Sequence, residues 1–508
     1  MGEGFRNSIE SGTDKGKEHV KSCTKCWQVS NCACGRKVEH DWICNSCNSA
    51  ESSPDAIELR AKIERQHVTP EHCHAKVMKG SRADGLPENM LVLDTGQPEL
   101  PPVEKREPQT PEEVDELYRE TIRGGTIDHH SIDAAVLTMP AGAERRCATK
   151  MIADFPDEVV AMIKERKIES VSGHIDSDLD SIASTFLARS LVQSKSVADL
   201  PAITEQLAEI VNLTDYGKFR EADPEKYATS LPGVFGALKD QIMDMAREQS
   251  GAVWRDATLS YDEKRKKTAE ISDVYHEKLI TAVFEILNAC NRQKLSGEEV
   301  DLAALDLDKI PVPEELRKMM KKGKELTIET RRVFDREFEK AEKREVTVQD
   351  KLGRSITVPL VIFAETELSP LEVTNLAYQR LAPEAIIAVY AGQDRTRGGD
   401  TYDIGIKPET AADVFSLELL EQPFNAAEAE KREPILAELD AKVADGTITP
   451  EEKKRLDLWR TPRKGKEHLG IGDPTVLVAG GSLIAASNTS LLNSEDFRRV
   501  LQGVFTQG

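Results

Sequence analysis

Four short apolar runs in the first half of the chain each end in carboxylate or imidazole side chains. The segments are LVLDTG, GTIDHHSID, SVSGHIDSDLDSIAS and VNLTDYGKFR, all between residues 91 and 220. Short apolar runs that alternate with helical patterns are typical of an α/β domain. Because the carboxyl ends of parallel strands meet at one edge of a sheet, the side chains that follow them can converge. The sequence therefore predicts a parallel sheet with a polar site at its edge.

The residue types at these positions indicate the chemistry of that site. Carboxylates and imidazoles without thiolates suit Mn²⁺ or Mg²⁺ better than a structural zinc. Two such cations about 3.5–4 Å apart polarise a phosphoryl group and lower the pKa of a shared water. Asp178 and Asp180 flank Leu179, so on an extended turn they would point to the same side and serve the two metals separately. A helix that starts just after them would bring its free amides near a bound phosphate.

Together these segments resemble the motifs of the DHH phosphoesterases. The matching patterns are Asp-Thr-Gly from Asp94, Asp-His-His from Asp128, His-x3-Asp-x-Asp-Ser from His174 and Asp-x-Gly-x-Phe-Arg from Asp215. Four motifs in about 125 residues make coincidence a minor prospect. The resemblance covers Met90 to about Phe219. It implies a DHH-type catalytic domain and manganese-dependent hydrolysis of phosphodiester or phosphoanhydride bonds.

The resemblance also implies a role for each side chain. Six are expected metal ligands: His174 and Asp178 for one ion, His129, Asp180 and Asp215 for the other, and Asp94 as the bridge. His130 would contact the scissile phosphate. Asp128 would not bind a metal itself but would orient a histidine through a hydrogen bond. The alternatives are a helix cap or turn residue for Asp94 and Asp215, and a solvated loop for the other positions.

The order of the motifs departs from the family pattern. In the family the His-x3-Asp-x-Asp motif normally comes first in the chain, whereas here it follows Asp-His-His and precedes Asp215. A simple circular permutation would place Asp215 before His174. Two explanations remain open: either the strands are rewired, or the assignment of Asp94 or Asp215 is mistaken.

Six of the nine cysteines cluster near the N-terminus: Cys23, Cys26, Cys32, Cys34, Cys44 and Cys47. Each close pair can offer two thiolates to a tetrahedral zinc, so we expect at least one structural zinc. A second zinc is an open alternative, with Cys73 or nearby histidines as further donors. The metal would hold together a module too small for a core of its own. Contact of this module with nucleic acid or another protein is also left open.

The remaining patterns divide the chain into four parts. They are a zinc-ribbon-like module at 1–80, a catalytic α/β domain at 85–230, a helical linker at 231–344 and a second, smaller α/β domain at 345–508. The second domain begins with two β-rich runs around Asp350-Lys351-Leu352-Gly353, which predict a hairpin. A charged stretch at about 425–466 interrupts it and predicts a helical hairpin that turns at Asp445-Gly446.

A glycine-containing segment, VLVAGGSLIAAS, lies near the end of the second domain. It is similar to the Gly-Gly-Gly-His patch of the DHH-associated domain, which binds the far end of the substrate, but Ser482 replaces the histidine. Gly480 and Gly481 would let backbone amides approach a phosphate or base closely. Arg395 and Arg397 are candidate phosphate contacts. The respective alternatives are a tight turn and a solvated loop.

The overall charge and hydropathy limit the possible functions. A net charge of −21 argues against a protein that coats long nucleic acid, so any such contact must be local. No run approaches eighteen apolar residues, so we expect a cytoplasmic protein without membrane contact. The expected function is a two-metal phosphoesterase, an exonuclease or nucleotide phosphodiesterase, that cleaves short oligonucleotides or small nucleotides with a metal-activated water. The alternatives are a pyrophosphatase or polyphosphatase, and a non-enzymatic zinc-ribbon adaptor on an inactive scaffold.

Overall fold

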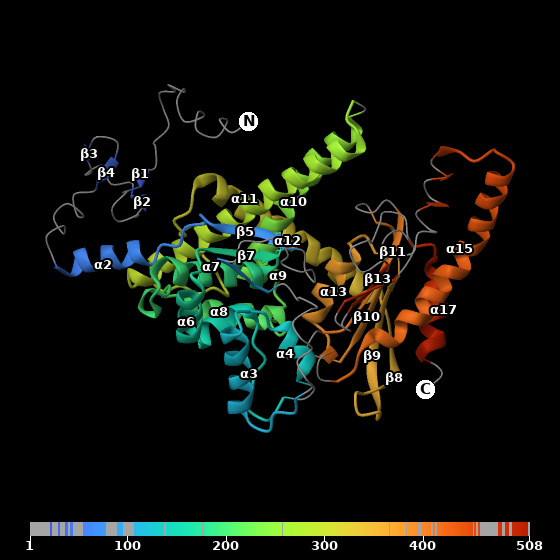
Figure 1. The fold of residues 1–508 in the computed structure, drawn as a ribbon, viewed down its shortest axis with the longest axis horizontal. Coiled ribbons are helices and arrows are strands. Elements are labelled where there is room, and N and C mark those ends of the chain that lie inside the picture. The colour runs from blue at the N-terminus through green and yellow to red at the C-terminus, as the bar shows by residue number, and fades with distance from the viewer. Residues whose placement is uncertain are drawn as a thin grey trace.

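Two β-sheets joined by long helices organise the chain in the computed structural model (Figure 1). The structure describes residues 54–505 with gaps at 78–88, 95–105, 137–138, 175–176, 257, 365, 383, 395–398, 408–409, 412–413, 451, 454–455, 458–475, 480–482 and 487–489. Before residue 54 it describes short strands: β1 (Lys21–Ser22), β2 (Val29–Ser30), β3 (Arg36–Val38) and β4 (Asp41–Ile43). β1 pairs with β2 and β3 pairs with β4, both antiparallel. The six cysteines predicted to bind zinc lie outside the described residues.

A three-stranded parallel sheet carries the predicted site. Its order is β5 (Cys73–Val77), β7 (Ser170–His174) and β6 (Met90–Val92). An isolated parallel bridge between Leu93 and Ile127 adds the Asp-His-His segment to the edge of this sheet. The strands predicted just before Asp94 and at His174 are therefore present, whereas the run at Ile127 forms only that bridge.

Strand β5 lies in the segment that the sequence assigned to the N-terminal module. Its pairing with β7 places it in the parallel sheet instead, after helix α2 (Pro54–Arg65). Cys73 is buried in this strand, and burial raises the pKa of its thiol to about 12. The role of Cys73 in a second zinc site stays a prediction, because the six clustered cysteines lie outside the described residues.

The rest of this domain is helical. Its helices are α3 (Pro111–Arg123), α4 (His130–Ala135), α5 (Ala148–Asp154), α6 (Pro156–Arg166), α7 (Leu179–Ser194), α8 (Thr204–Asp215) and α9 (Pro224–Tyr227). Every side chain of α7 from Leu179 to Val192 is buried, and the helix contacts β7, α5, α6 and α8. The helix therefore has no exposed face between these two residues and is packed on all sides. This packing fixes the start of α7 at the edge of the sheet.

The run from Ile210 to Leu213 is a helix and not the predicted strand. It lies inside α8, where Leu207, Ile210 and Val211 are buried at helical spacing. A short apolar run fits a buried helix as well as a buried strand, and periodicity alone does not separate the two. Asp215 therefore ends a helix, which corrects the expectation that it follows a strand.

Three long helices, α10 (Leu231–Arg255), α11 (Tyr261–Leu295) and α12 (Glu314–Lys340), fill the segment predicted to be helical. From Tyr275 onward α11 packs into the first domain, where it contacts β5, α7 and α2. Among the described residues, no helix is both long and apolar enough to span a membrane.

A six-stranded mixed sheet forms the second domain. Its order is β12 (Val476–Ala479), β13 (Leu483–Ala486), β11 (Gly399–Gly405), β10 (Ile386–Asp394), β9 (Ser355–Ala364) and β8 (Glu342–Gln349). Strands β9 and β10 are parallel, and the other neighbours are antiparallel. The predicted hairpin is present as β8 and β9, with Gly353 in the turn at φ 76°.

Helices cover both faces of this sheet. Ile386 and Ala388 pack into a core with α15 (Glu421–Ala444) and α17 (Ser494–Phe505), whereas Ile387 and Val389 face α13 (Pro370–Tyr378). This alternation follows from the two-residue period of a strand. Helix α15 is the first arm of the predicted helical hairpin, and the chain turns after it at Asp445-Gly446, as the sequence predicted.

Helix α12 connects the two domains through a buried arginine. Arg331 donates from Nη1 to the Glu221 carbonyl at 2.7 Å and from Nη2 to the side chain of Gln379. Its guanidinium lies 3.6 Å from the centre of the Tyr227 ring. Glu221 and Tyr227 belong to the first domain, and Gln379 follows α13 in the second. One side chain therefore contacts both domains.

Candidate metal centre

Seven carboxylate and imidazole side chains meet at the edge of the parallel sheet. They form three overlapping groups, and within each group the ligand atoms lie within 4.8 Å of one another. The groups are Asp94, His174 and Asp178; His129, Asp180 and Asp215; and Asp94, His129 and His130. The structure thus brings together all seven of these predicted side chains despite the unusual order of the motifs. Each of the three groups has the donor atoms to hold a metal ion.

Asp94 lies where two of these groups meet. It follows β6 with a left-handed φ of 49°, a conformation that aspartate tolerates better than most residues. Its amide donates to the Ile127 carbonyl at 3.1 Å, so the turn is attached to the neighbouring segment. The carboxylate is buried, with Oδ2 3.4 Å from His174 Nε2 and Oδ1 3.4 Å from His129 Nε2. One carboxylate therefore faces an imidazole on each side.

Asp178 and Asp180 are fixed in different ways at the start of α7. Asp178 caps the helix: Oδ1 accepts from the Ser181 amide at 2.9 Å, and Oδ2 lies 3.2 Å from His174 Nε2. Asp180 lies in the first turn, so the two do not share the extended turn that the sequence predicted. They nevertheless belong to different ligand groups. Asp178 already accepts a hydrogen bond from the Ser181 amide of the α7 N-terminus, and the phosphate contact expected there stays a prediction.

Asp180 is held by the start of a neighbouring helix. Its Oδ2 accepts from the Ala148 amide and its Oδ1 from the Thr149 amide, both at 2.8 Å. These are the first two amides of α5, which have no partner within that helix. The carboxylate is thus oriented by two backbone donors and faces His129 and Asp215.

His129 is oriented as a ligand by partners that the sequence interpretation missed. Its Nδ1 lies 2.7 Å from Asp133 Oδ2 and 3.0 Å from the Tyr216 hydroxyl, and Arg145 Nη1 donates to the other oxygen of Asp133 at 2.7 Å. Tyr216 also donates to Asp133, so the carboxylate accepts and Nδ1 carries the proton. The buried Nε2 makes no hydrogen bond and faces Asp94 and Asp215. Burial lowers the pKa of His129, but the neighbouring carboxylates outweigh this and raise it well above its usual value. Loss of the Nε2 proton would leave a nitrogen that suits a metal.

The contact between Asp133 and His129 could have been predicted from the sequence. Asp133 lies four residues after His129, which is one helical turn. If GTIDHHSID had been interpreted as a strand end followed by a helix, this pairing could have been predicted. Tyr216 directly follows Asp215, but nothing local indicates its contact with Asp133. Arg145 reaches the group from a separate loop and carries no sequence signal at all.

Asp133→Asn is expected to lower Mn²⁺ affinity about 10- to 100-fold, because His129 loses the acceptor that fixes its protonation and orientation. Isothermal titration of Mn²⁺ into the purified protein measures this change. Tyr216→Phe removes the hydroxyl from the same cluster but keeps the carboxylate, and should have a smaller effect. Wild-type affinity in Asp133→Asn would show that the carboxylate does not support a ligand.

The electrostatics of the cluster fit a cation. Burial raises the pKa of Asp215 to about 7; the charge of His129 opposes this shift, whereas Asp180 and Asp94 add to it. Burial and the charge of Asp94 likewise raise the pKa of Asp180. Burial lowers the pKa of His174, but hydrogen bonds to its two neighbouring carboxylates outweigh this and raise it to about 9. Crowded, buried carboxylates of this kind are stabilised by bound divalent ions.

Asp128 and His130 form a separate pair beside the ligand groups. Asp128 Oδ1 lies 2.8 Å from His130 Nδ1 and also accepts from the His130 amide at 3.0 Å. Burial raises the pKa of Asp128, but its hydrogen bond with His130 outweighs this and holds the pKa well below its usual range. The His130 side chain is 35% exposed, against 6% for His129. His130 is therefore anchored on one side and accessible on the other.

The other predicted substrate contacts cannot be placed with the metal centre. Gly480, Gly481, Ser482, Arg395 and Arg397 lie outside the described residues. The strands that flank this segment, β12 and β13, pair antiparallel. The predicted roles of all five residues stay predictions.

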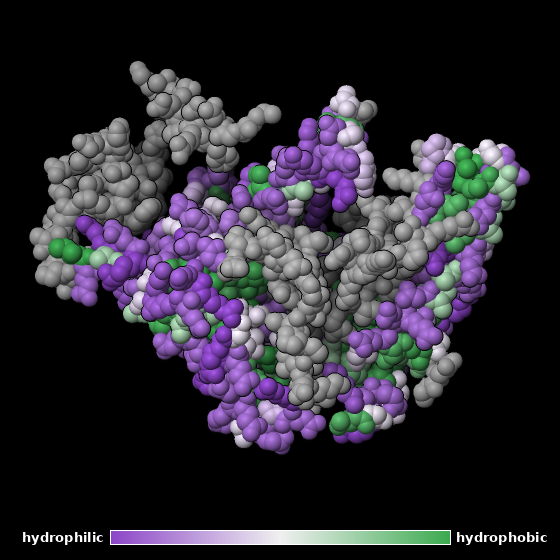
Figure 2. Space-filling view, in the orientation of Figure 1, coloured by the Kyte–Doolittle hydropathy of each residue, from purple (hydrophilic) through white to green (hydrophobic). Residues whose placement is uncertain are grey.

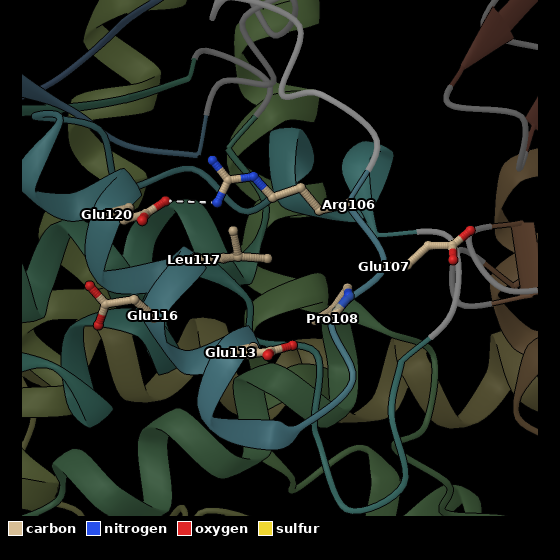
Figure 3. A pocket seen from close by; sticks show the side chains of 7 residues that line it. All are labelled: Arg106, Glu107, Pro108, Glu113, Glu116, Leu117 and Glu120. Atoms are coloured by element: carbon tan, nitrogen blue, oxygen red, sulfur yellow. Dashed lines mark hydrogen bonds and ion pairs between the residues drawn. The ribbon is translucent and has the colours of Figure 1, made fainter.

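A pocket of about 360 Å³ lies elsewhere, against α3 (Figure 3). It is lined by Arg106, Glu107, Pro108, Glu113, Glu116, Leu117 and Glu120. Arg106 pairs with Glu120 at 3.0 Å, which leaves the other glutamates to repel an anionic ligand. The pocket contains none of the predicted site residues and does not suit a phosphate.

Comparison of the chain with models of protein families, with curated proteins and with solved structures gave no match.

Proposed function

We propose that this protein is a two-metal phosphoesterase that hydrolyses phosphodiester bonds of short oligonucleotides or small nucleotides. The observation that carries the proposal is the pair of ligand groups, one with His174 and Asp178 and one with His129, Asp180 and Asp215, on either side of Asp94. Two adjacent cations are a recurrent solution for phosphoryl transfer. The resemblance of the four motifs to the DHH phosphoesterases points to the same chemistry.

The donor set favours manganese. Asp94, His129 and His174 offer oxygen and imidazole nitrogen, which suit Mn²⁺ or Mg²⁺. Cys147 lies beside the second group, but burial and the charges of Asp180 and Asp215 raise the pKa of its thiol well above the usual value. Without a bound metal, this thiol stays protonated. When bound, the two cations would polarise the phosphoryl group and acidify the attacking water.

The protein residues supply position and charge. Asp128 orients the His130 ring, so that its accessible side can face a phosphoryl oxygen as a hydrogen-bond donor. Such a donor is most effective when it is held in place before the reaction starts. Asp133 and the α5 amides hold His129 and Asp180, so the ligand groups keep their geometry without a substrate.

A substrate panel in Mn²⁺ tests the proposal. It compares short RNA, short DNA, cyclic dinucleotides, nucleoside bisphosphates and pyrophosphate, and hydrolysis of at least one phosphodiester is expected. Asp199→Asn is a matched control because Asp199 pairs with Arg65 and belongs to none of the ligand groups. If the protein hydrolysed only pyrophosphate, its function would be the hydrolysis of phosphoanhydrides and not of phosphodiesters. Mn²⁺ binding without any turnover would contradict the proposed enzyme and favour the adaptor.

A further inference from the structure

The outer ends of α10 and α11, residues 247–256 and 258–270, form an arm that lies outside the core. The buried residues of α10 end at Ala246, and those of α11 begin at Tyr275. At 1.5 Å per residue, the part of α11 before Tyr275 is about 20 Å long. Figure 1 shows this pair of helices projecting from the body, and Figure 2 shows its largely hydrophilic surface. A helical arm without core contacts suggests a role in binding.

Two aromatic side chains lie together near the tip of the arm. Trp254 is 40% exposed and Tyr261 is 57% exposed, which makes them the most exposed aromatic side chains among the described residues. Their ring centres are 5.6 Å apart, and the ring planes are inclined by 64°. Lys264 Nζ donates to the Trp254 carbonyl at 3.0 Å and so joins the two helices. The two rings therefore pack on each other while part of each stays exposed to solvent.

Positive charge surrounds these rings. Residues 264–267 are Lys-Arg-Lys-Lys, and Arg265, Lys266 and Lys267 are exposed. Tyr261 and Arg265 are four residues apart, which places them on the same side of α11. From 254 to 267 there are five basic and three acidic residues, a net +2 in a chain of net −21. Glu263, one of those acids, belongs to the capping box at the start of α11.

We propose that this tip binds single-stranded nucleic acid. Bases would stack on Trp254 and Tyr261, and the phosphates would contact the side chains of Arg265, Lys266 and Lys267. Stacking platforms flanked by cations are the general solution for single strands, because every base presents a π-face. The acidic remainder of the chain repels a polyanion, so the contact is confined to this patch. The binding itself is independent of hydrolysis; combined with the proposed function, it makes a single-stranded chain the substrate class.

Fluorescence anisotropy of labelled dT20 and U20 tests this inference on the full chain, with no added divalent metal. The wild type is expected to bind at low salt. Trp254→Ala should weaken binding by roughly five- to a hundredfold. Replacing Arg265, Lys266 and Lys267 together by Gln should reduce the slope of log Kd against log salt by about 2, since each phosphate contact contributes about 0.7.

Two matched variants separate this site from unspecific effects. Replacing Lys318, Lys321 and Lys322 by Gln removes three exposed charges from α12, and Leu352→Ala removes an exposed apolar side chain from the β8–β9 turn. Neither should weaken binding as the arm variants do. Equal losses in these controls, or a wild type that binds neither probe, would overturn the inference. So would a wild-type dimer that Trp254→Ala dissociates, because the tip would then bind a second copy.

A generic small phosphodiester distinguishes this inference from the proposed function. The arm variants should hydrolyse it in Mn²⁺ at the wild-type rate, since none of the replaced side chains belongs to the metal centre. If the wild type hydrolysed this substrate but bound no oligonucleotide, the arm would not be a nucleic-acid-binding site, and the proposed phosphoesterase would stand. If the wild type bound the oligonucleotides but hydrolysed nothing, the binding role of the arm would stand, and the proposed phosphoesterase would be contradicted.

Discussion

Asp94→Asn is expected to lower Mn²⁺-dependent phosphodiester turnover at least about a thousandfold. Asp94 belongs both to the group of His174 and Asp178 and to the group of His129 and His130, so its replacement removes charge from both. Asparagine has nearly the same shape and tolerates the positive φ of this position, so the fold should be retained. Initial rates on the preferred substrate of the panel, at several Mn²⁺ concentrations, measure the effect.

Thermal denaturation provides the control for Asp94→Asn. Burial is the main cause of the raised pKa of Asp180 and Asp215, and the charge of Asp94 adds to it. Removal of that charge relieves the added repulsion, so the metal-free variant should melt no lower than the wild type. Mn²⁺ at about 100 times Kd should stabilise the wild type by about 2.7 kcal/mol and the variant much less. A variant that keeps both its turnover and this stabilisation would show that Asp94 is not a shared ligand.

His130→Ala is expected to lower kcat about a hundred- to a thousandfold while Mn²⁺ still binds. The reason is its position: the ring is anchored on Asp128 and remains accessible, as a donor to a phosphoryl oxygen must be. Single-turnover rates measure the loss, and the Mn²⁺-dependent melting shift should stay close to that of the wild type.

The opposite result would assign His130 a different role. Its Nδ1 is 3.5 Å from Asp94 Oδ1, and the two residues share a ligand group with His129. If His130→Ala also lost the Mn²⁺-dependent melting shift, His130 would be a metal ligand. Asp128→Asn serves as the companion variant: it should reduce kcat less than His130→Ala, because the ring remains but loses its orienting carboxylate.

Part of the site could be predicted from the sequence because some of its ligands lie at or just after the ends of strands. Asp94 and His174 come at or just after the ends of β6 and β7, and neighbouring parallel strands bring such residues together. Asp215 was predicted to join the site for a wrong reason, since it ends a helix. Its run of four apolar residues carried no information that separates a helix from a strand.

The remaining features depend on tertiary contacts between distant segments. Arg145 supports Asp133, and Ala148 and Thr149 support Asp180, across 12 to 32 residues of chain. No local pattern marks a backbone amide as the partner of a distant carboxylate. The placement of β5 beside β7 was missed for a similar reason, because CHAKV stands close to a cysteine cluster that suggested a different module.

The double attachment of Arg331 affects the way in which the two domains can move. Arg331 donates hydrogen bonds to the Glu221 carbonyl, six residues after Asp215, and to the side chain of Gln379 in the second domain. Hydrogen bonds from a charged group contribute about 1.5–3 kcal/mol each, and their loss would leave a buried guanidinium without partners. A swing of the second sheet must therefore break these bonds or pull on the segment that carries Asp215. The hydrogen bonds of Arg331 thus set the spacing between the two domains before any substrate binds.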